Sequence, residues 1–260
     1  MQHTFGRLKK MTTEEKEQME KNFWKDDPEE NPNIFSIYNV MNKMYEAKAF
    51  LEKTVIYHSY FSKADSILEL GGGQGWASCI IKKIFTDSRV YATDLSSEAI
   101  KSLHKWEKIF DVVIDESFTC KSYEIPLDND SIDLVFCFQA AHHFSEHCKT
   151  LKDIYRVLKP DGVCLYLREP SCKKYIYPLA YRRVNNKRPN VPEDVLVYKE
   201  IVKFGELKGF RVSHKFDTSC TARHEFAAVY YYLLKKVKFL KFFLPCASDF
   251  IFHKQPRCLI

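Results

Sequence analysis

Short apolar runs alternate with longer amphipathic stretches through the middle of the chain. The alternation predicts strands at 66–70, 89–93, 117–121, 132–138 and 162–168, and helices at 75–86, 97–110 and 146–158. Such a pattern favours an α/β fold, in which helices cover both faces of a doubly wound parallel sheet. Ligands of these sheets bind at the carboxyl ends of the strands.

Helical spacing dominates before the first strand. Residues 13–25 mix charged positions with scattered apolar ones and predict an exposed amphipathic helix. Apolar side chains recur at helical spacing over 34–45 and again over 50–61, which makes two or three helices in all. Most of this aromatic and methionine stripe is expected to be core, and Tyr38 or Tyr45 are the positions expected to face a pocket.

The regular rhythm breaks after Leu167. Residues 169–193 contain four prolines and many Arg, Lys and Tyr, which predicts an insertion rather than a simple crossover. A helix is expected from Pro192 to Leu207, ending at Gly209, followed by a strand over 210–216. A helical insertion near 224–244 is apolar on one side and basic on the other. It is read either as an interfacial helix touching anionic lipid or as a core-facing stripe with a solvated face.

Two features of the strand ends indicate an adenosine-bearing ligand. Gly71, Gly73 and Gly75 follow the first strand, where glycine permits sharp turns and close approach of a ligand to bare backbone. A dinucleotide fingerprint beginning at Gly71 would need glycine at Trp76, so the spacing argues against a pyrophosphate. Asp94 closes the second strand, where an acidic side chain can accept both ribose hydroxyls.

Four motifs in order resemble those of class I S-adenosylmethionine-dependent methyltransferases, in particular the small-molecule branch with the quinone-type enzymes. They are Glu69-x-Gly71-x-Gly73-x-Gly75, Asp94 after the second strand, Ile132–Phe136 with His142-His143 beyond it, and Arg156–Gly162. The resemblance covers roughly residues 63 to 170. It implies a mostly parallel seven-stranded sheet with an antiparallel last strand at 249–253, paired with 210–216. It also implies an N-terminal helical cap, residues 1–62, before a Rossmann-like domain, residues 63–260.

The same resemblance implies S-adenosyl-L-methionine as cofactor and indicates which residues bind it. Asp94 would take the ribose, Leu95 the adenine, and Glu69 would position the glycine loop or meet the methionine amine through water. The helix start after Gly75 favours the methionine carboxylate. At the position of Lys121 the family often has an acidic residue that binds the adenine amino group. Backbone groups near Ser122 and Tyr123 are expected to bind the adenine instead. The cofactor set is Glu69, Gly71, Gly73, Gly75, Asp94, Leu95, Ser122, Tyr123 and Gln139.

Methyl transfer from a sulfonium is an in-line displacement, which requires positioning more than covalent catalysis. His142 or His143, following the fourth strand, is a candidate base for a hydroxyl acceptor, since histidine titrates near working pH. The alternatives are that both histidines only shape the pocket, or that proximity alone suffices. His142, His143, Glu146, His147 and Cys148 also have metal-ligand spacing, but no further anchored partner is visible, and no metal is expected.

The acceptor is expected to be a small, anionic metabolite. Tyr177, Arg182 and Arg183 fall where the resembled family places acceptor-recognition loops, and Tyr38 lies where it often has a lid. Guanidinium groups hold carboxylate or phosphate with two parallel bonds, and tyrosines supply flat walls. A loop that owes its charge to solubility is the alternative.

Bulk properties narrow the setting. A chain of 260 residues suits one α/β core, and nine cysteines without a C-x-x-C pair fit a reduced, cytoplasmic compartment. Neither a secretory signal nor a run of about 20 apolar residues is present in this sequence. The net charge of +6 includes basic clusters at 173–188 and 235–241, but no nucleic-acid module accompanies them. A non-catalytic adenosyl-binding scaffold and a lipid or quinone methyltransferase at a membrane surface are the rival functions. The oligomeric state stays open.

Overall fold

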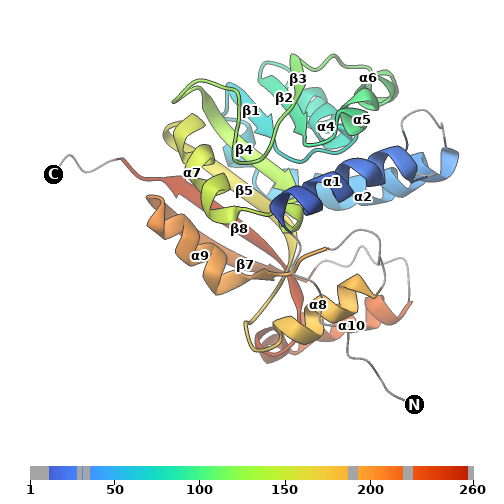
Figure 1. Cartoon of the computed structure of the whole chain (residues 1–260), viewed down its shortest axis with the longest axis vertical. Coiled ribbons are helices and arrows are strands. Elements are labelled where there is room, and N and C mark those ends of the chain that lie inside the picture. The colour runs from blue at the N-terminus through green and yellow to red at the C-terminus, as the bar shows by residue number, and fades with distance from the viewer. Residues whose placement is uncertain (1–11, 28–30, 32–35, 187–192, 219–224, 257–260) are drawn as a thin grey trace.

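The computed structural model describes residues 12–27, 31, 36–186, 193–218 and 225–256, without the side chains of 225–227. Its centre is an eight-stranded sheet with the order β3-β2-β1-β4-β5-β8-β7, and β6 pairs with β5 off this path (Figure 1). The strands are β1 Ser66–Glu69, β2 Arg89–Asp94, β3 Glu116–Thr119, β4 Ile132–Phe138, β5 Leu158–Cys172, β6 Leu196–Val197, β7 Phe210–Asp217 and β8 Cys246–Lys254.

The predicted strand pairing is confirmed. β1 to β6 form only parallel pairs among themselves, whereas β8 runs antiparallel to both β5 and β7. The eighth strand was not predicted: Leu196 and Val197 add two residues beside the end of β5, where the sequence suggested the start of a helix. Val195 and Leu196 are buried and apolar, so this segment joins the sheet, and the helix begins only at Tyr198. Pro192 lies outside the described residues.

Helices surround the sheet in the expected order, with some different bounds. Residues 97–110 form two helices that meet at Ser102, and 37–56 form one long helix that Ser36 caps by accepting from the Asn39 N–H. The helices are α1 Thr13–Asp26, α2 Ile37–Ile56, α3 His58–Phe61, α4 Trp76–Ile84, α5 Ser97–Lys101, α6 Leu103–Phe110, α7 His147–Val157, α8 Tyr177–Asn185, α9 Tyr198–Leu207 and α10 Glu225–Lys236, with short 3-10 turns η1 Ala141–His143 and η2 Lys238–Phe242.

Two apolar clusters, one on each face of the sheet, form the core. α2, α4 and α6 contribute to one, and α7 and α9 to the other. Phe50 of α2 is fully buried, and its ring lies 5.6 Å from that of Phe136 and 5.2 Å from that of Phe138 on β4. Truncating such a side chain to alanine typically costs about 3–5 kcal/mol. α2 is therefore an integral layer of the core, whereas α1 buries no residue and lies across the strand ends (Figure 1).

Candidate functional site

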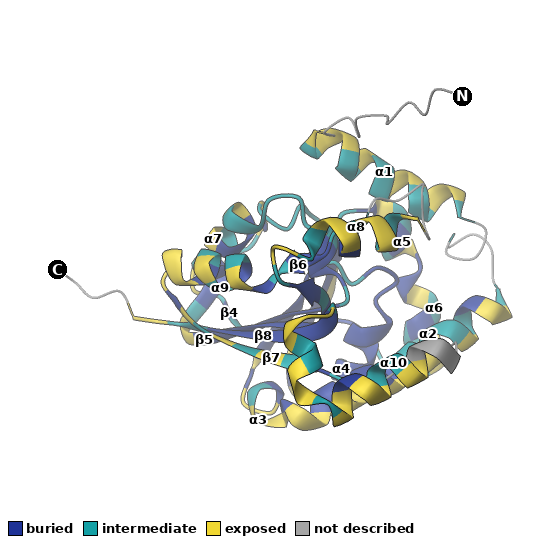
Figure 2. Cartoon of the chain, turned by 90° about the horizontal axis from the view of Figure 1, so that it is seen from below, coloured by how far each residue is buried: buried dark blue, intermediate teal, exposed yellow. Residues whose placement is uncertain are grey.

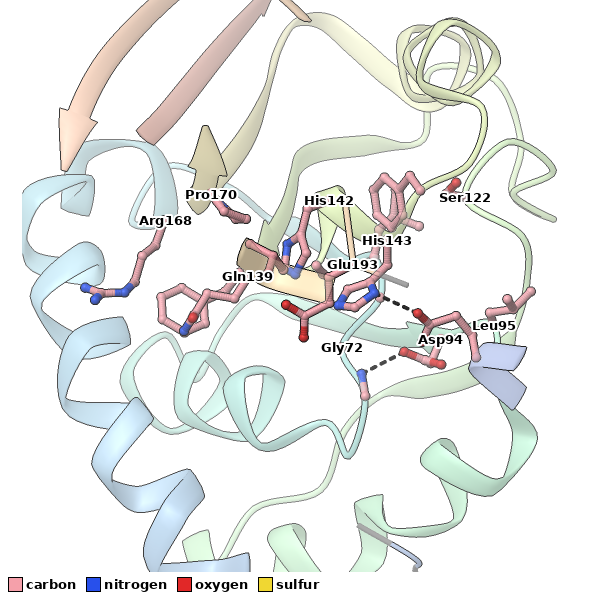
Figure 3. Close-up of a pocket in the computed structure, with 18 of the residues that line it drawn as sticks. Gly72, Asp94, Leu95, Ser122, Gln139, His142, His143, Arg168, Pro170 and Glu193 are labelled. Atoms are coloured by element: carbon pink, nitrogen blue, oxygen red, sulfur yellow. Dashed lines mark hydrogen bonds and ion pairs between the residues drawn. The ribbon is translucent and has the colours of Figure 1, made fainter. Parts of the chain in front are cut away.

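A pocket of about 700 Å³ opens at the carboxyl ends of the central strands. Its walls come from the turns after β1, β2, β3 and β4, from the end of β5, and from α1 and α2. α8, α10 and the start of β8 close its other end. Figure 3 shows Asp94 and Leu95 on one side, His142 and His143 in the middle, and Gln139 and Arg168 on the other side. The pocket thus lies where the topology of a parallel sheet predicts a ligand.

The glycine turn exposes bare backbone to this pocket. Gly71, Gly73 and Gly75 have φ angles of +68°, +56° and +79°, a left-handed region that other residues rarely adopt. Gly72 has no room for a side chain, since a Cβ there would lie 2.7 Å from Cδ of Glu69. Gly71, Gly72 and Gly73 line the pocket; Gly75 does not, and instead starts α4 against Leu103. The turn requires glycine for two reasons, conformation and space.

Glu69 supports this turn from below. Its carboxylate is buried and accepts hydrogen bonds from the backbone N–H of Ser78, 3.0 Å, and from the Ser78 hydroxyl. Burial raises the pKa of Glu69 to about 7, although the Ser78 hydrogen bonds act in the opposite direction. The first turn of a helix favours a nearby negative charge, and at α4 the Glu69 carboxylate supplies part of that charge.

Asp94 is fixed by the backbone on both oxygens. Gly73 N–H donates to Oδ2 at 2.9 Å and Ser96 N–H donates to Oδ1 at 2.8 Å. Burial raises the pKa of Asp94 to about 6, partly offset by these two hydrogen bonds. Each carboxylate oxygen has a second lone pair, so Asp94 retains the capacity to accept from a ligand. Leu95, the next residue, also lines the pocket.

The turn after β3 forms the wall beyond Leu95. Ser122 and Tyr123 both line the pocket, but their hydroxyls have partners in the protein. Ser122 Oγ lies 2.8 Å from Thr150 Oγ1, and the Tyr123 hydroxyl donates to Glu17 of α1. Lys121, where the resembled family often has an acid, lies 3.4 Å from the same Glu17. An acidic residue is therefore present at this end of the pocket, but α1 supplies it.

His142 is held by a carboxylate that the sequence analysis missed. Glu169 is fully buried at the end of β5 and accepts from the backbone N–H groups of Ala140, Ala141 and His142 at 2.9 to 3.1 Å. Its Oε2 lies 2.8 Å from Nδ1 of His142. Because an ionised carboxylate only accepts, Nδ1 carries a proton, and in the neutral tautomer of the ring the lone pair is on Nε2. Gln139, just before this turn, lines the pocket with a φ of +51°.

His143 has a different environment from its neighbour. Its ring lies 4.1 Å from that of His142, but its Nδ1 forms an ion pair with Glu20 of α1 at 2.7 Å. Burial lowers the pKa of His143, yet Glu20 more than compensates, and the pKa rises to about 9. His143 is therefore protonated at neutral pH and links α1 to η1.

α1 lies over the glycine turn. A Cβ on Gly73 would lie 2.9 Å from the ring of Trp24, which shows how closely α1 approaches the loop. Glu17, Glu20, Phe23 and Trp24 line the pocket from this helix. The signal for these positions in the sequence is the apolar pair Phe23-Trp24 in an otherwise charged helix.

The far end of the pocket is built by the two insertions. Arg183 of α8 lines it, with its guanidinium 5.6 Å from the ring centroid of Tyr230 on α10. Arg168 also lines it; this buried residue has a φ of +57°, and its Nη1 lies 3.5 Å from Asp217. In the sequence, Arg168 and Glu169 are recognisable as site candidates because they are charged residues that directly follow an apolar strand.

Three predicted acceptor residues do not reach the pocket. Tyr38 is 58% exposed on α2, and Tyr45 likewise points to solvent. Tyr177 donates to Asp194 and packs in a small cluster with Ala180 and Val195. Arg182 is exposed and absent from the pocket wall, because neighbouring residues on a helix point about 100° apart.

The described part of the chain contains neither a cluster of metal ligands nor a disulfide bond. There, no three His, Cys, Asp or Glu side chains come together in a way that could hold a metal ion. The seven cysteines within the described residues are free thiols.

Known proteins resemble the central part of the chain. Residues 68–166 match the family model described as a methyltransferase domain. An uncharacterised methyltransferase of Schizosaccharomyces pombe is 34% identical over 103 residues, 39% of this chain and 38% of that protein. A malonyl-[acyl-carrier protein] O-methyltransferase of Priestia megaterium is 27% identical over 50% of this chain and 48% of its own length. The chain thus spans half or less of these two relatives.

Solved structures show the same fold. The YcgJ protein of Bacillus subtilis superposes with a TM-score of 0.55 at 15% identity, over 74% of this chain and 92% of its own. The resemblance inferred from the four motifs is therefore confirmed for the central region.

Proposed function

We propose that this protein, whose residues 68–166 match the model of a methyltransferase domain, transfers a methyl group from S-adenosyl-L-methionine to a small-molecule acceptor. The observation that carries the proposal is the pairing of Asp94 with the glycine turn, in which the Gly73 N–H fixes a buried carboxylate beside exposed backbone. When bound, the cofactor supplies an activated methyl group on a sulfonium. The protein's own task is then to bind, orient and exclude water.

The pocket walls fit such a cofactor. Asp94 would accept from the ribose hydroxyls, and the backbone at Gly71 to Gly73 would lie along the methionine half of the molecule. Leu95 and the backbone of Ser122 and Tyr123 would hold the adenine. Glu69 and Gln139 would complete the binding set near the methionine end.

His142 is the better candidate for a general base. Its Nδ1 faces Glu169, so Nε2 of the neutral tautomer would take the proton from a hydroxyl acceptor. His143 is protonated through Glu20, so we assign it to holding α1 rather than to proton transfer. Glu169 acts through His142 and is a positioning residue.

We further propose that the acceptor carries an anionic group held by Arg183. This side chain lines the pocket and its guanidinium lies over the flat ring of Tyr230. We place the reaction in the cytoplasm, a proposal supported by the free thiols of the described residues.

Calorimetry with S-adenosylmethionine and S-adenosylhomocysteine tests cofactor binding. We expect Asp94→Ala to weaken both by roughly 10- to 100-fold, because it removes charge-assisted hydrogen bonds worth about 1.5–3 kcal/mol. Asp87→Ala, an exposed aspartate beyond α4, is the matched control and should bind as wild type does. Absence of binding heat in the wild-type protein would refute the proposal.

Label transfer separates an enzyme from a silent adenosyl-binding scaffold. With tritiated methyl cofactor and an anion-exchange-retained metabolite fraction, we expect a labelled product. Arg183→Ala should reduce labelling of acidic acceptors, while Arg182→Ala, a neighbour that does not line the pocket, should not. Binding without any labelled product would favour the scaffold, and equal effects of the two arginine variants would remove the anionic acceptor.

The role of His142 is tested on the labelled product by its pH profile. We expect His142→Gln to lower kcat by about 10²–10⁴-fold with little change in cofactor affinity. Glu169→Gln should shift the acid limb of the kcat profile, since it changes the partner of Nδ1. An unchanged profile in both variants would mean that proximity alone drives the reaction.

A further inference from the structure

α10 is apolar on both of its sides. On its inner side, Leu234 is fully buried, and Tyr230 and Tyr231 line the pocket. On its outer side, Val229, Tyr232 and Leu233 are 58%, 58% and 46% exposed. Spacings of three and four residues place these three on one face of the helix. A helix at a water-facing surface normally presents charged or polar side chains there.

The apolar surface continues beyond this helix. In and after η2, Phe239, Phe242, Phe243 and Leu244 are all exposed by 37% or more, and across from them Tyr175 and Leu179 are more than 60% exposed. The Tyr175 hydroxyl donates to the Phe242 carbonyl at 3.0 Å, so the two insertions touch. We call residues 173–186 and 228–244 the apolar-basic face. Figure 2 shows long exposed stretches on both its helices, α8 and α10.

Charge on this face has a single sign. The two segments contain eight Lys and Arg residues and no Asp or Glu, whereas the whole chain has a net charge of +6. The rest of the chain is therefore net negative. Lys173 extends its ammonium over the rings of Phe242 and Phe243, 5.3 and 5.5 Å from their centroids, so cations and aromatic rings are interleaved. Lysines around aromatic rings thus take the place of the separate apolar and basic sides that the sequence predicts for residues 224–244.

We propose that the apolar-basic face binds the surface of an anionic lipid bilayer. Aromatic and leucine side chains enter the boundary between headgroups and acyl chains, while lysines reach lipid phosphates and carboxylates. Basic residues close to an anionic leaflet each contribute about 1 kcal/mol. Charge complementarity favours an anionic bilayer as the occupant of this face, because an anion in solution would not bury the exposed rings. Since α10 lines the pocket with its inner side, binding places the pocket directly behind the lipid boundary.

None of the helices within the described residues is long and apolar enough to cross a membrane. The proposed contact is accordingly peripheral, and salt should weaken it.

Vesicle flotation tests the proposal without cofactor or acceptor, so its outcome is independent of methyl transfer. We expect the full-length protein to float with vesicles of phosphatidylcholine that contain about 30 mol% phosphatidylserine, and to detach in about 0.5 M NaCl. The triple variant Lys235→Gln, Lys236→Gln, Lys238→Gln should bind at least tenfold more weakly. All three lysines are exposed, and circular dichroism would verify that the variant is folded.

The apolar part of the face needs its own variant. Phe239→Ser with Phe243→Ser removes two exposed rings that contact each other, and we expect at least a tenfold loss of binding even at low salt. Matched controls are Lys48→Gln, Lys199→Gln, Lys203→Gln for charge and Val55→Ser, Val113→Ser for exposed apolar area. Both controls should bind as wild type does.

Three results would overturn the proposal. The first is no flotation with anionic vesicles, and the second is an equal loss of binding in the control variants. The third is concentration-dependent self-association in sedimentation velocity that the Phe239 and Phe243 changes abolish while vesicle binding persists, which would assign the face to a second copy of this chain.

Discussion

Replacing Glu69 with glutamine tests whether the carboxylate beneath the glycine turn destabilises the fold at neutral pH. Burial raises the pKa of Glu69 from its ordinary value of 4.5 to about 7. This interval corresponds to about 3 kcal/mol of free energy that disfavours the ionised group in the folded state. The Ser78 hydrogen bonds reduce this cost but do not remove it.

The sign of the pH dependence follows from where the proton is held. Between pH 4.5 and 7 the folded protein keeps a proton on Glu69 that the unfolded chain has lost. The contribution of this group to the free energy of unfolding therefore falls by up to about 1.4 kcal/mol per pH unit and levels off above pH 7. Below pH 4.5 the group is neutral in both states and has no such effect.

The glutamine side chain keeps the shape and lacks the charge. Its carbonyl can still accept from the Ser78 N–H and hydroxyl, so the local hydrogen bonds survive. We expect the variant to match the wild type near pH 4.5 and to exceed its stability by about 3 kcal/mol at pH 8. Urea unfolding across this range measures the difference, with the exposed Glu52→Gln as control. A stability difference that is the same at both pH values would refute the reasoning.

Three further outcomes follow from the geometry. Gly73→Ala should weaken cofactor binding at least tenfold in calorimetry, because φ is +56° and the new Cβ would lie 2.9 Å from Trp24; unchanged affinity would contradict the close approach of α1. Glu20 holds the His143 pKa at about 9, so the wild type should lose this ion pair, and with it cofactor affinity, above that pH. Glu20→Gln lacks the ion pair at every pH, so its cofactor affinity should show no such loss. Gly205→Ala should lower the free energy of unfolding by about 1–3 kcal/mol, since its Cβ would lie 2.6 Å from Val212, without changing cofactor affinity; thermal unfolding and calorimetry check both parts.

The fold was largely readable because its signals are local. A strand, a glycine turn and a helix start all lie within residues 66–84, and Asp94 directly ends the next strand. These features need no knowledge of distant packing. The two-residue strand β6 escaped notice because its pairing with Ser171 and Cys172 depends on the path of an insertion.

Helix phase explains the acceptor residues that were misplaced. Arg182 and Arg183 are equivalent in composition and charge, yet only Arg183 faces the pocket. Which of two neighbours faces inward depends on what the helix packs against, and α8 packs on an insertion with no repeating pattern. The same reason applies to Tyr38, which is exposed because the core face of α2 points away from it.

An irregularity in β5 made the position of Glu169 unpredictable from the sequence. The register between β5 and β8 shifts between Tyr166 and Glu169, and Arg168 has a positive φ. Simple alternation along the strand therefore gives the wrong side for these residues, whereas the location of His142 after β4 was readable from the order of the motifs.

The first helix is joined to the rest through half-buried side chains. None of its residues is fully buried, and its links include the pairs of Glu17 and Glu20, the hydrogen bond from Thr13 to Glu146, and the ring of Trp24 above Gly73. Because α1 lines the pocket but contributes no buried residue, we expect its displacement to open the pocket and leave the sheet intact. If the proposed function holds, substitutions at these contacts would change the rate of product release and leave every core side chain in place.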